Sequence, residues 1–177
     1  MASLDFGKSH VIAWAKTIFP HGSTCLDVGP CDGKWHDLLG DHFVMDAVEI
    51  YKPNIEKHDL ESKYRNVWCQ DIADFTYDWY DLIVLGDVIE HMTVEQAQKV
   101  IEYAKPRCMD LLIAIPFKWK QGNEYGNEWE IHVQDDLTPA LFEERYHGLM
   151  PLSKPLPNYA YYVKEMPGFV RTGGKTP

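Results

Sequence analysis

The chain has 177 residues and a formal net charge of −10, from 17 Lys and Arg against 27 Asp and Glu. Its hydrophobic share of 45% and aromatic share of 13% are typical of a folded globule and exclude a disordered chain. An acidic chain lacks the broad positive field that drives nucleic-acid binding, so we expect no broad nucleic-acid partner. The length predicts one domain over residues 1–177, ending in a flexible tail at 166–177.

The four cysteines are scattered along the chain and form no CxxC pair. This favours reduced, mostly packed thiols in a cytosolic protein. The first ten residues lack the basic and apolar pattern of a signal peptide, and no apolar run approaches the roughly 20 residues of a membrane span. We therefore expect a cytoplasmic protein with no membrane partner, whose oligomeric state the sequence leaves open.

Helical spacing of apolar residues over 7–19 predicts an amphipathic N-terminal helix. Residues 94–104 also have one apolar helical face, and Thr93 with Gln96 predicts a capping box at the start of that helix. Largely apolar strands alternating with helices predict an α/β fold with a parallel sheet covered on both faces. The predicted strands are 24–28, 45–50, 67–70, 82–85 and 111–117.

The alternation of strands and helices ends after the fifth predicted strand. Residues 118–136 are polar and aromatic, and they predict a long functional loop. Thr138 followed by Pro139 opens another helix. Two strand-like stretches at 149–154 and 159–166, separated by prolines, then predict a hairpin.

The first strand runs into a turn in which Gly29 and Gly33 bracket Pro30, Cys31 and Asp32. In an open parallel sheet, ligands bind beyond the carboxyl ends of the strands, and the first such turn supplies the glycines. A dinucleotide fold would have G-x-G-x-x-G, but Cys31 stands where the middle glycine belongs. Acidic residues before and within the turn, Asp27 and Asp32, would repel a pyrophosphate. They suit a ligand with a cationic portion, such as an ammonium or a sulfonium.

Two further strand ends are acidic. Glu49 ends the second strand, next to Ile50, at a position where a carboxylate can bind both hydroxyls of a ribose. Asp71 follows the third strand beside Ile72, and this pair fits an adenine ring. A single strand-end carboxylate is often only a solvated cap, but the three features in this order favour a nucleotide-type ligand. Adenine, ribose and a cationic tail together describe S-adenosylmethionine.

Residues 7–166 resemble the class I S-adenosylmethionine-dependent methyltransferases, in their small-molecule branch. The resemblance rests on "LDVGPCDGKW", which departs from the family at Cys31, and on "VEIY", "CQDIADF" and "YDLIVLGDVIEHM". It implies a Rossmann-like, doubly wound, seven-stranded, mostly parallel sheet whose last two strands form the C-terminal antiparallel hairpin. The segment "FGKSH" is similar to an N-terminal lid, which implies that Ser9 and His10 close over the cofactor. The predicted cofactor-binding residues are Ser9, Asp27, Gly29, Pro30, Asp32, Gly33, Glu49, Ile50, Asp71, Ile72, Gly86 and Asp87.

The predicted catalytic residues are Asp87, Glu90 and His91, after the fourth strand, and His132 in the long loop. If the first three lie on one helical turn, their spacing places them on one face. The four together resemble the metal-binding set of two O-methyltransferase groups, one making ubiquinone and one capping small RNAs at the terminal 2′-hydroxyl, although those groups carry Glu where this chain has Asp87. One alternative is a divalent metal, Mg or Mn, bound by all four residues. Another is direct handling of the acceptor by His91 or His132.

A third alternative is that Glu90 and His91 only orient their loop, one pairing with a lysine and the other with a backbone carbonyl. Trp119, Tyr125 and Trp129 form the acceptor pocket wall, or else pack on their own loop.

We expect a methyltransferase that acts on a small-molecule acceptor, at oxygen in preference to nitrogen or carbon. The Asn-Pro-Pro-aromatic motif that clamps amide groups does not follow the fourth strand, which disfavours methylation of DNA bases or glutamine. Two other classes stay open: a nicotinamide-dependent oxidoreductase, and a non-catalytic module that keeps the cofactor fold as an interaction surface. The sequence does not identify the acceptor.

Overall fold

The computed structural model describes residues 7–123 and 126–165, so the predicted tail lies outside the described residues. Seven strands of this part of the chain form one sheet. In chain order they are β1 (Ser23–Val28), β2 (Phe43–Glu49), β3 (Val67–Cys69), β4 (Tyr80–Gly86), β5 (Cys108–Pro116), β6 (Leu149–Pro151) and β7 (Tyr159–Lys164). In space their order is β3-β2-β1-β4-β5-β7-β6. The five predicted strands and the hairpin are confirmed.

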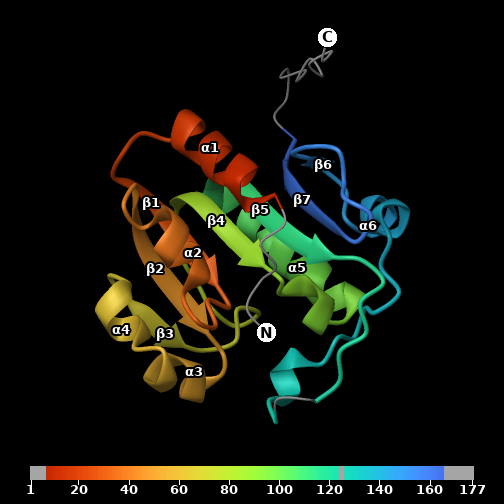
Figure 1. Ribbon diagram of the computed structural model, residues 1–177, viewed down its shortest axis with the longest axis horizontal. Coiled ribbons are helices and arrows are strands. Elements are labelled where there is room, and N and C mark those ends of the chain that lie inside the picture. Colours follow the sequence, from red (N-terminus) through yellow and green to blue (C-terminus); the bar gives the residue numbers. More distant parts are fainter. Residues whose placement is uncertain (1–6, 124–125, 166–177) are drawn as a thin grey trace.

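Strands β1 to β5 are parallel, whereas β7 runs antiparallel between β5 and β6 (Figure 1). The central strands β1, β4 and β5 are buried along most of their length, as expected for strands covered on both faces. Chain order reverses at β1, because β2 lies on one side of it and β4 on the other. This reversal is the switch point at which an open α/β sheet binds its ligand.

Helices cover both faces of the sheet (Figure 1). One face packs against α1 (Lys8–Ile18), α2 (Lys34–Leu39), α3 (Lys52–Lys57) and α4 (Leu60–Lys63). The other face packs against α5 (Val94–Ala104) and α6 (Pro139–Arg145). Three short 3-10 turns complete the described elements: η1 (Ile89–His91), η2 (Lys105–Arg107) and η3 (Glu128–Glu130). Among the described residues, no helix has the length and apolar character needed to cross a membrane.

Helix α5 begins as its sequence predicts. The Thr93 hydroxyl accepts a hydrogen bond from the Gln96 backbone N–H at 3.2 Å, and the Gln96 side chain accepts one from the Thr93 N–H at 3.0 Å. This reciprocal capping box satisfies two backbone donors at the helix start. Ala97, Val100 and Ile101 on one side of the helix are buried against the sheet. The N-terminus of α5, which carries this capping box, follows η1 in the chain and thus comes shortly after the carboxyl end of β4.

The turn after β1 has an unusual backbone. Gly29 and Gly33 take positive φ angles of 65° and 84°, and Cys31 between them has φ 52°. Left-handed conformations are costly for residues with a Cβ, which explains the two glycines. Cys31 takes the same region although it stands at the position without a glycine. The turn therefore keeps its tight path despite the departure from the family pattern.

Candidate active site

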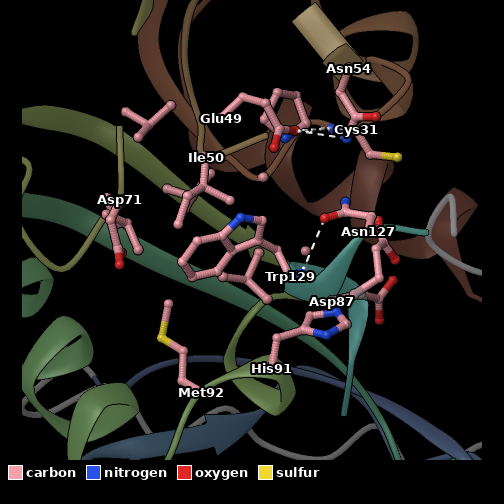
Figure 2. Close-up of a pocket in the computed structure, with 18 of the residues that line it drawn as sticks. Cys31, Glu49, Ile50, Asn54, Asp71, Asp87, His91, Met92, Asn127 and Trp129 are labelled. Carbon is pink, nitrogen blue, oxygen red and sulfur yellow. Dashed lines mark hydrogen bonds between the residues drawn. The ribbon is translucent and has the colours of Figure 1, made fainter. Parts of the chain in front are cut away.

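A pocket opens at the carboxyl edge of the parallel strands (Figure 2). It encloses about 140 Å³, and its walls come from the loops after β1, β2, β3 and β4, together with residues 127–130 of the long loop. These loops are far apart in the sequence but meet here because parallel strands all end at the same sheet edge. The lining residues include Gly29, Pro30, Asp32, Glu49, Ile50, Asp71, Ile72, Gly86 and Asp87, all of them predicted cofactor-binding residues.

Three other predicted cofactor residues, Ser9, Asp27 and Gly33, are not among those that line this pocket. Ser9 and His10 are both exposed on α1, and their closure over a cofactor stays a prediction. Asp27 is buried, and its Oδ2 accepts a hydrogen bond from the Tyr64 hydroxyl at 2.5 Å. Gly33 faces α4, because a Cβ at this position would meet the Lys63 side chain.

The Glu49 side chain connects the loops after β1 and β2 in the pocket wall. Its buried carboxylate accepts a hydrogen bond from the Cys31 backbone N–H at 3.1 Å and another from the Tyr51 N–H at 2.9 Å. The Asn54 side-chain amide donates a third, longer bond at 3.4 Å. Burial raises the pKa of Glu49, while the two backbone hydrogen bonds oppose that rise. Each carboxylate oxygen has two lone pairs, so the group can accept ligand hydroxyls in addition.

One end of the pocket is lined by Ile50, Asp71 and Met92, and we call it the apolar end (Figure 2). Ile72, which follows Asp71 in the chain, also lines the pocket. One Asp71 oxygen accepts a hydrogen bond from the Ala73 backbone N–H at 2.9 Å, which fixes the carboxylate at the start of this turn. Flat apolar walls with a fixed acceptor at the edge match the requirements of a planar base with an exocyclic amino group.

Asp27 lies beneath the glycine turn rather than in the pocket. Burial raises its pKa to about 7, although the hydrogen bond from Tyr64 and the nearby Lys8 ammonium both lower it. Lys8 is itself buried at the start of α1, with its Nζ 4.9 Å from the centre of the Trp35 ring. Asp27 on β1 thus lies between Lys8 of α1 and Tyr64 at the end of α4, and its contact with a ligand stays a prediction.

Residues 87–91 do not form one helical turn, so the condition under which Asp87, Glu90 and His91 would share a face is not met. Asp87 has a positive φ of 56°, and the short η1 turn starts only two residues later. The left-handed residue redirects the chain, so Asp87 and His91 line the pocket while Glu90 points into the protein. The Asp87 carboxylate accepts hydrogen bonds from the Tyr159 hydroxyl at 2.7 and 2.8 Å.

His91 and His132 are brought together from different loops. Their ring centroids lie 4.7 Å apart in an edge-on arrangement. His91 Nδ1 lies 3.2 Å from the Ile131 carbonyl, and His132 Nδ1 lies 2.8 Å from the Trp119 carbonyl. A carbonyl only accepts, so both Nδ1 atoms carry the proton, and each Nε2 keeps its lone pair. Burial and the charge of His132 lower the pKa of His91 to about 4, and burial lowers the pKa of His132.

Glu90 completes this cluster. Its side chain is only 1% exposed, and neither carboxylate oxygen has a hydrogen-bond partner among the described residues. Burial and the charge of Asp87 raise the pKa of Glu90 well above its usual value. In the alternative in which these two residues only orient their loop, the backbone carbonyl partner is present at His91, whereas the described residues offer Glu90 no lysine partner.

The same cluster contains residue types that can ligate a metal ion. Glu90, His91 and His132 each offer one ligand atom, and these atoms lie within 4.8 Å of one another. Fixed Nδ1 protons and free Nε2 lone pairs suit metal ligation, as does a buried carboxylate without a partner. Asp87 does not belong to this group, and its carboxylate accepts a hydrogen bond from the Tyr159 hydroxyl. Three of the four predicted ligands thus fit a divalent ion.

Sequence reasoning missed part of the pocket. Trp129 was expected at the acceptor wall, yet it reaches the apolar end of the pocket (Figure 2). Trp119 contributes its carbonyl to His132, and Tyr125 lies outside the described residues. The aromatic content of the long loop was the only signal for this wall, and it did not specify which ring enters. The lining residues without a predicted role include Lys34, Trp35, Asn54, Val88, Met92, Gln96, Asn127 and Glu130.

The sheet order, the antiparallel seventh strand and the glycine turn after β1 define the fold of the class I S-adenosylmethionine-dependent methyltransferases, as the sequence resemblance implied. No protein-family model and no curated protein matches the sequence. Solved structures do match it. An S-adenosylmethionine-dependent methyltransferase from Clostridium acetobutylicum ATCC 824 superposes with a TM-score of 0.70 at 13% identity, with 92% of each chain covered.

Two further solved structures differ in their acceptor atom. The N-methyltransferase NodS from Bradyrhizobium japonicum WM9, in complex with S-adenosyl-L-homocysteine, matches with a TM-score of 0.63 at 14% identity. That match covers 89% of this chain and 85% of NodS. An O-methyltransferase family protein from Burkholderia thailandensis matches with a TM-score of 0.58 at 15% identity, covering 89% of this chain and 55% of that one. At these identities the likeness establishes the fold.

Proposed function

We propose that this protein is an S-adenosylmethionine-dependent methyltransferase acting on a small-molecule acceptor. One observation carries the proposal: the glycine turn, Glu49 and the Asp71–Ile72 pair, predicted separately from three strand ends, line a single pocket. They do so in a fold that solved methyltransferases share. The proposal treats residues 1–177 as one cytoplasmic domain.

In the proposed complex, each part of the cofactor has its own partner. Glu49 accepts hydrogen bonds from both ribose hydroxyls, and Ile50 and Ile72 pack against the adenine, whose amino group donates to Asp71. The bare backbone at Gly29 allows the amino-acid tail to approach the turn. The pocket is rich in carboxylates, including Asp32 and Asp87, and this favours the positive charge of the sulfonium and ammonium groups.

Methyl transfer is a direct displacement at carbon, so catalysis depends on alignment and, for a hydroxyl acceptor, on proton removal. We place the acceptor beside Asp87 and His91, with oxygen as the preferred atom. The hydrogen bond from the Tyr159 hydroxyl fixes the position of the Asp87 carboxylate. Since NodS is an N-methyltransferase, a nitrogen acceptor is the alternative.

Two versions of proton removal follow from the histidine pair. In the first, the free Nε2 of His132 or His91 accepts the acceptor proton. Both imidazoles are neutral at pH 7 because their pKa values are lowered, as a base requires. In the second, Glu90, His91 and His132 hold Mg or Mn, which when bound lowers the pKa of an acceptor hydroxyl.

The two other classes are less well supported. A nicotinamide-dependent oxidoreductase would place a pyrophosphate at this turn, where Asp32 and the buried Glu49 oppose it. Its sheet would also lack the antiparallel strand β7. A non-catalytic module needs no ordered histidine pair beside the pocket, yet His91, which lines it, and its neighbour His132 are both fixed by backbone carbonyls.

The deciding experiment is a thermal-shift screen with S-adenosylmethionine, S-adenosylhomocysteine and NAD, followed by a turnover assay over a panel of small hydroxyl and amine acceptors. We expect stabilisation by the first two ligands and not by NAD. Stabilisation by NAD alone would reject the methyltransferase. Cofactor binding without turnover on any acceptor would favour the non-catalytic module.

A further inference from the structure

Trp129 lines the pocket, although it belongs to the long loop after β5 and not to a turn between parallel strands. The residue belongs to η3, and its indole lies among Ile50, Asp71 and Met92, at the end of the pocket assigned above to adenine (Figure 2). Trp129 as a residue is 48% exposed, so it lies at the boundary between the pocket and solvent rather than in the core. A large flat side chain thus occupies the position where a base would have to enter.

The backbone around Trp129 is firmly anchored. The Asn127 side chain accepts a hydrogen bond from the Trp129 N–H at 3.1 Å, and the Gln121 amide donates to the Glu130 carbonyl at 2.7 Å. Further along, the N–H groups of Val133 and Gln134 both donate to the Glu90 carbonyl, at 2.9 and 3.0 Å. The loop is therefore tied to η1, and a change in the side-chain torsions of Trp129 would not require the loop itself to move.

The pocket is small with this ring in place. It encloses about 140 Å³, whereas sites for ligands of this size usually span about 300–1,000 Å³. Rotation of the Trp129 side chain toward solvent would add room at the adenine end without breaking the backbone hydrogen bonds described above. The walls formed by Ile50 and Ile72 would stay in place.

We propose that Trp129 is a gate residue of the cofactor pocket: its indole competes with the adenine of S-adenosylmethionine for the apolar end and must rotate outward before the cofactor binds. The inference rests on the proposed function. A competing side chain lowers the population of the binding-competent state, and the apparent affinity falls by the same factor. Removal of the ring therefore tightens binding and speeds association. A ring that instead stacked on the bound adenine would have the opposite effect, since its removal would weaken binding about fivefold to a hundredfold.

The test compares the full chain with Trp129→Ala and with the matched control Trp79→Ala. Trp79 is similarly exposed, at 56%, but it precedes β4 at the opposite edge of the sheet and does not line the pocket. Affinity for S-adenosylhomocysteine and for adenosine is measured by calorimetry, and association rates by stopped flow. We expect Trp129→Ala to bind both ligands about threefold to tenfold more tightly and to associate faster by a similar factor. Trp79→Ala should match the wild type.

Unchanged or weaker binding by Trp129→Ala, with wild-type binding intact, overturns the gate and leaves the cofactor site standing. If neither protein binds S-adenosylhomocysteine, the proposed function fails and the gate fails with it. An equal gain in Trp79→Ala also overturns the gate, because the effect would then come from tryptophan removal in general. Melting curves of both variants check that each one is folded.

Discussion

The Glu49 carboxylate accepts a hydrogen bond from the Cys31 backbone N–H at 3.1 Å, and this contact joins the end of β2 to the turn after β1. One side chain thereby supports the proposed ribose site and holds the glycine turn in its tight path. The left-handed Cys31, which has the conformation of a glycine without being one, is stabilised by the same bond. Substitution of Glu49 is thus expected to affect both binding and the turn.

Glu49→Ala should weaken S-adenosylmethionine binding about tenfold to a few hundredfold, because charge-assisted hydrogen bonds to ribose contribute roughly 1.5–3 kcal/mol each. Loss of the Cys31 and Tyr51 bonds should also lower the melting temperature modestly. Calorimetry measures the affinity, and Glu56→Ala, on the exposed side of α3, is the control. Unchanged affinity would remove Glu49 from the ribose site.

Gly29→Val should abolish cofactor binding. Gly29 has φ 65°, and a Cβ there would lie 3.0 Å from Val88 Cγ2, so any side chain strains the turn and intrudes on its neighbour. Asp71→Ala should weaken binding far less, since it removes one contact at the pocket rim. Titration of both variants with S-adenosylhomocysteine tests the ranking. A greater loss of affinity in Asp71→Ala than in Gly29→Val would contradict the assignment of the glycine turn as the essential contact and of Asp71 as a contact at the rim.

His132→Ala should lower turnover by a hundredfold or more if its Nε2 removes the acceptor proton. Its effect is compared with that of His147→Ala, which changes an exposed histidine outside the pocket. Activity that survives exhaustive EDTA treatment, yet is lost in His132→Ala, selects the base. Activity lost to EDTA and restored by magnesium or manganese selects the metal. Full turnover in both His91→Ala and His132→Ala would make these residues structural.

Asp27 should make stability depend on pH. Its pKa in the folded protein is raised to about 7, mainly by burial, so the folded state binds the proton more tightly than the unfolded state does. The resulting stabilisation is complete below about pH 4 and is lost as the pH rises to about 7. Asp27→Asn keeps an acceptor for Tyr64 and never ionises.

The free energy of unfolding of the wild type, relative to Asp27→Asn, should therefore fall by up to about 4 kcal/mol between pH 4 and pH 8. Urea denaturation of both proteins at pH 4, 6 and 8 provides the measurement. Contributions from His91 and other groups cancel in the difference, because both proteins carry them. A constant difference across this range would mean that Asp27 stays ionised beside Lys8.

The sequence by itself determined the order of the elements and one half of the pocket. Apolar periodicity and the Thr93 capping box are local signals, so the strands and α5 appear where they were predicted. Glu49 and Asp71 could be assigned together because parallel strands end at one sheet edge, whatever the loops do. At these two positions the strand topology alone is enough to predict which side chains lie close together.

The other half of the pocket was decided only by the tertiary structure. Sequence spacing could not show that Asp87 adopts a left-handed backbone and so prevents a helical turn, or that Tyr159 from a distant strand donates to its carboxylate. Sequence spacing also could not show that the long loop places Trp129 at the end of the pocket assigned to adenine. It could not show that Asp27 lies outside the pocket lining, where it accepts a hydrogen bond from Tyr64. Loop positions and buried charges depend on contacts between residues far apart in the chain, and local spacing carries no information about those contacts.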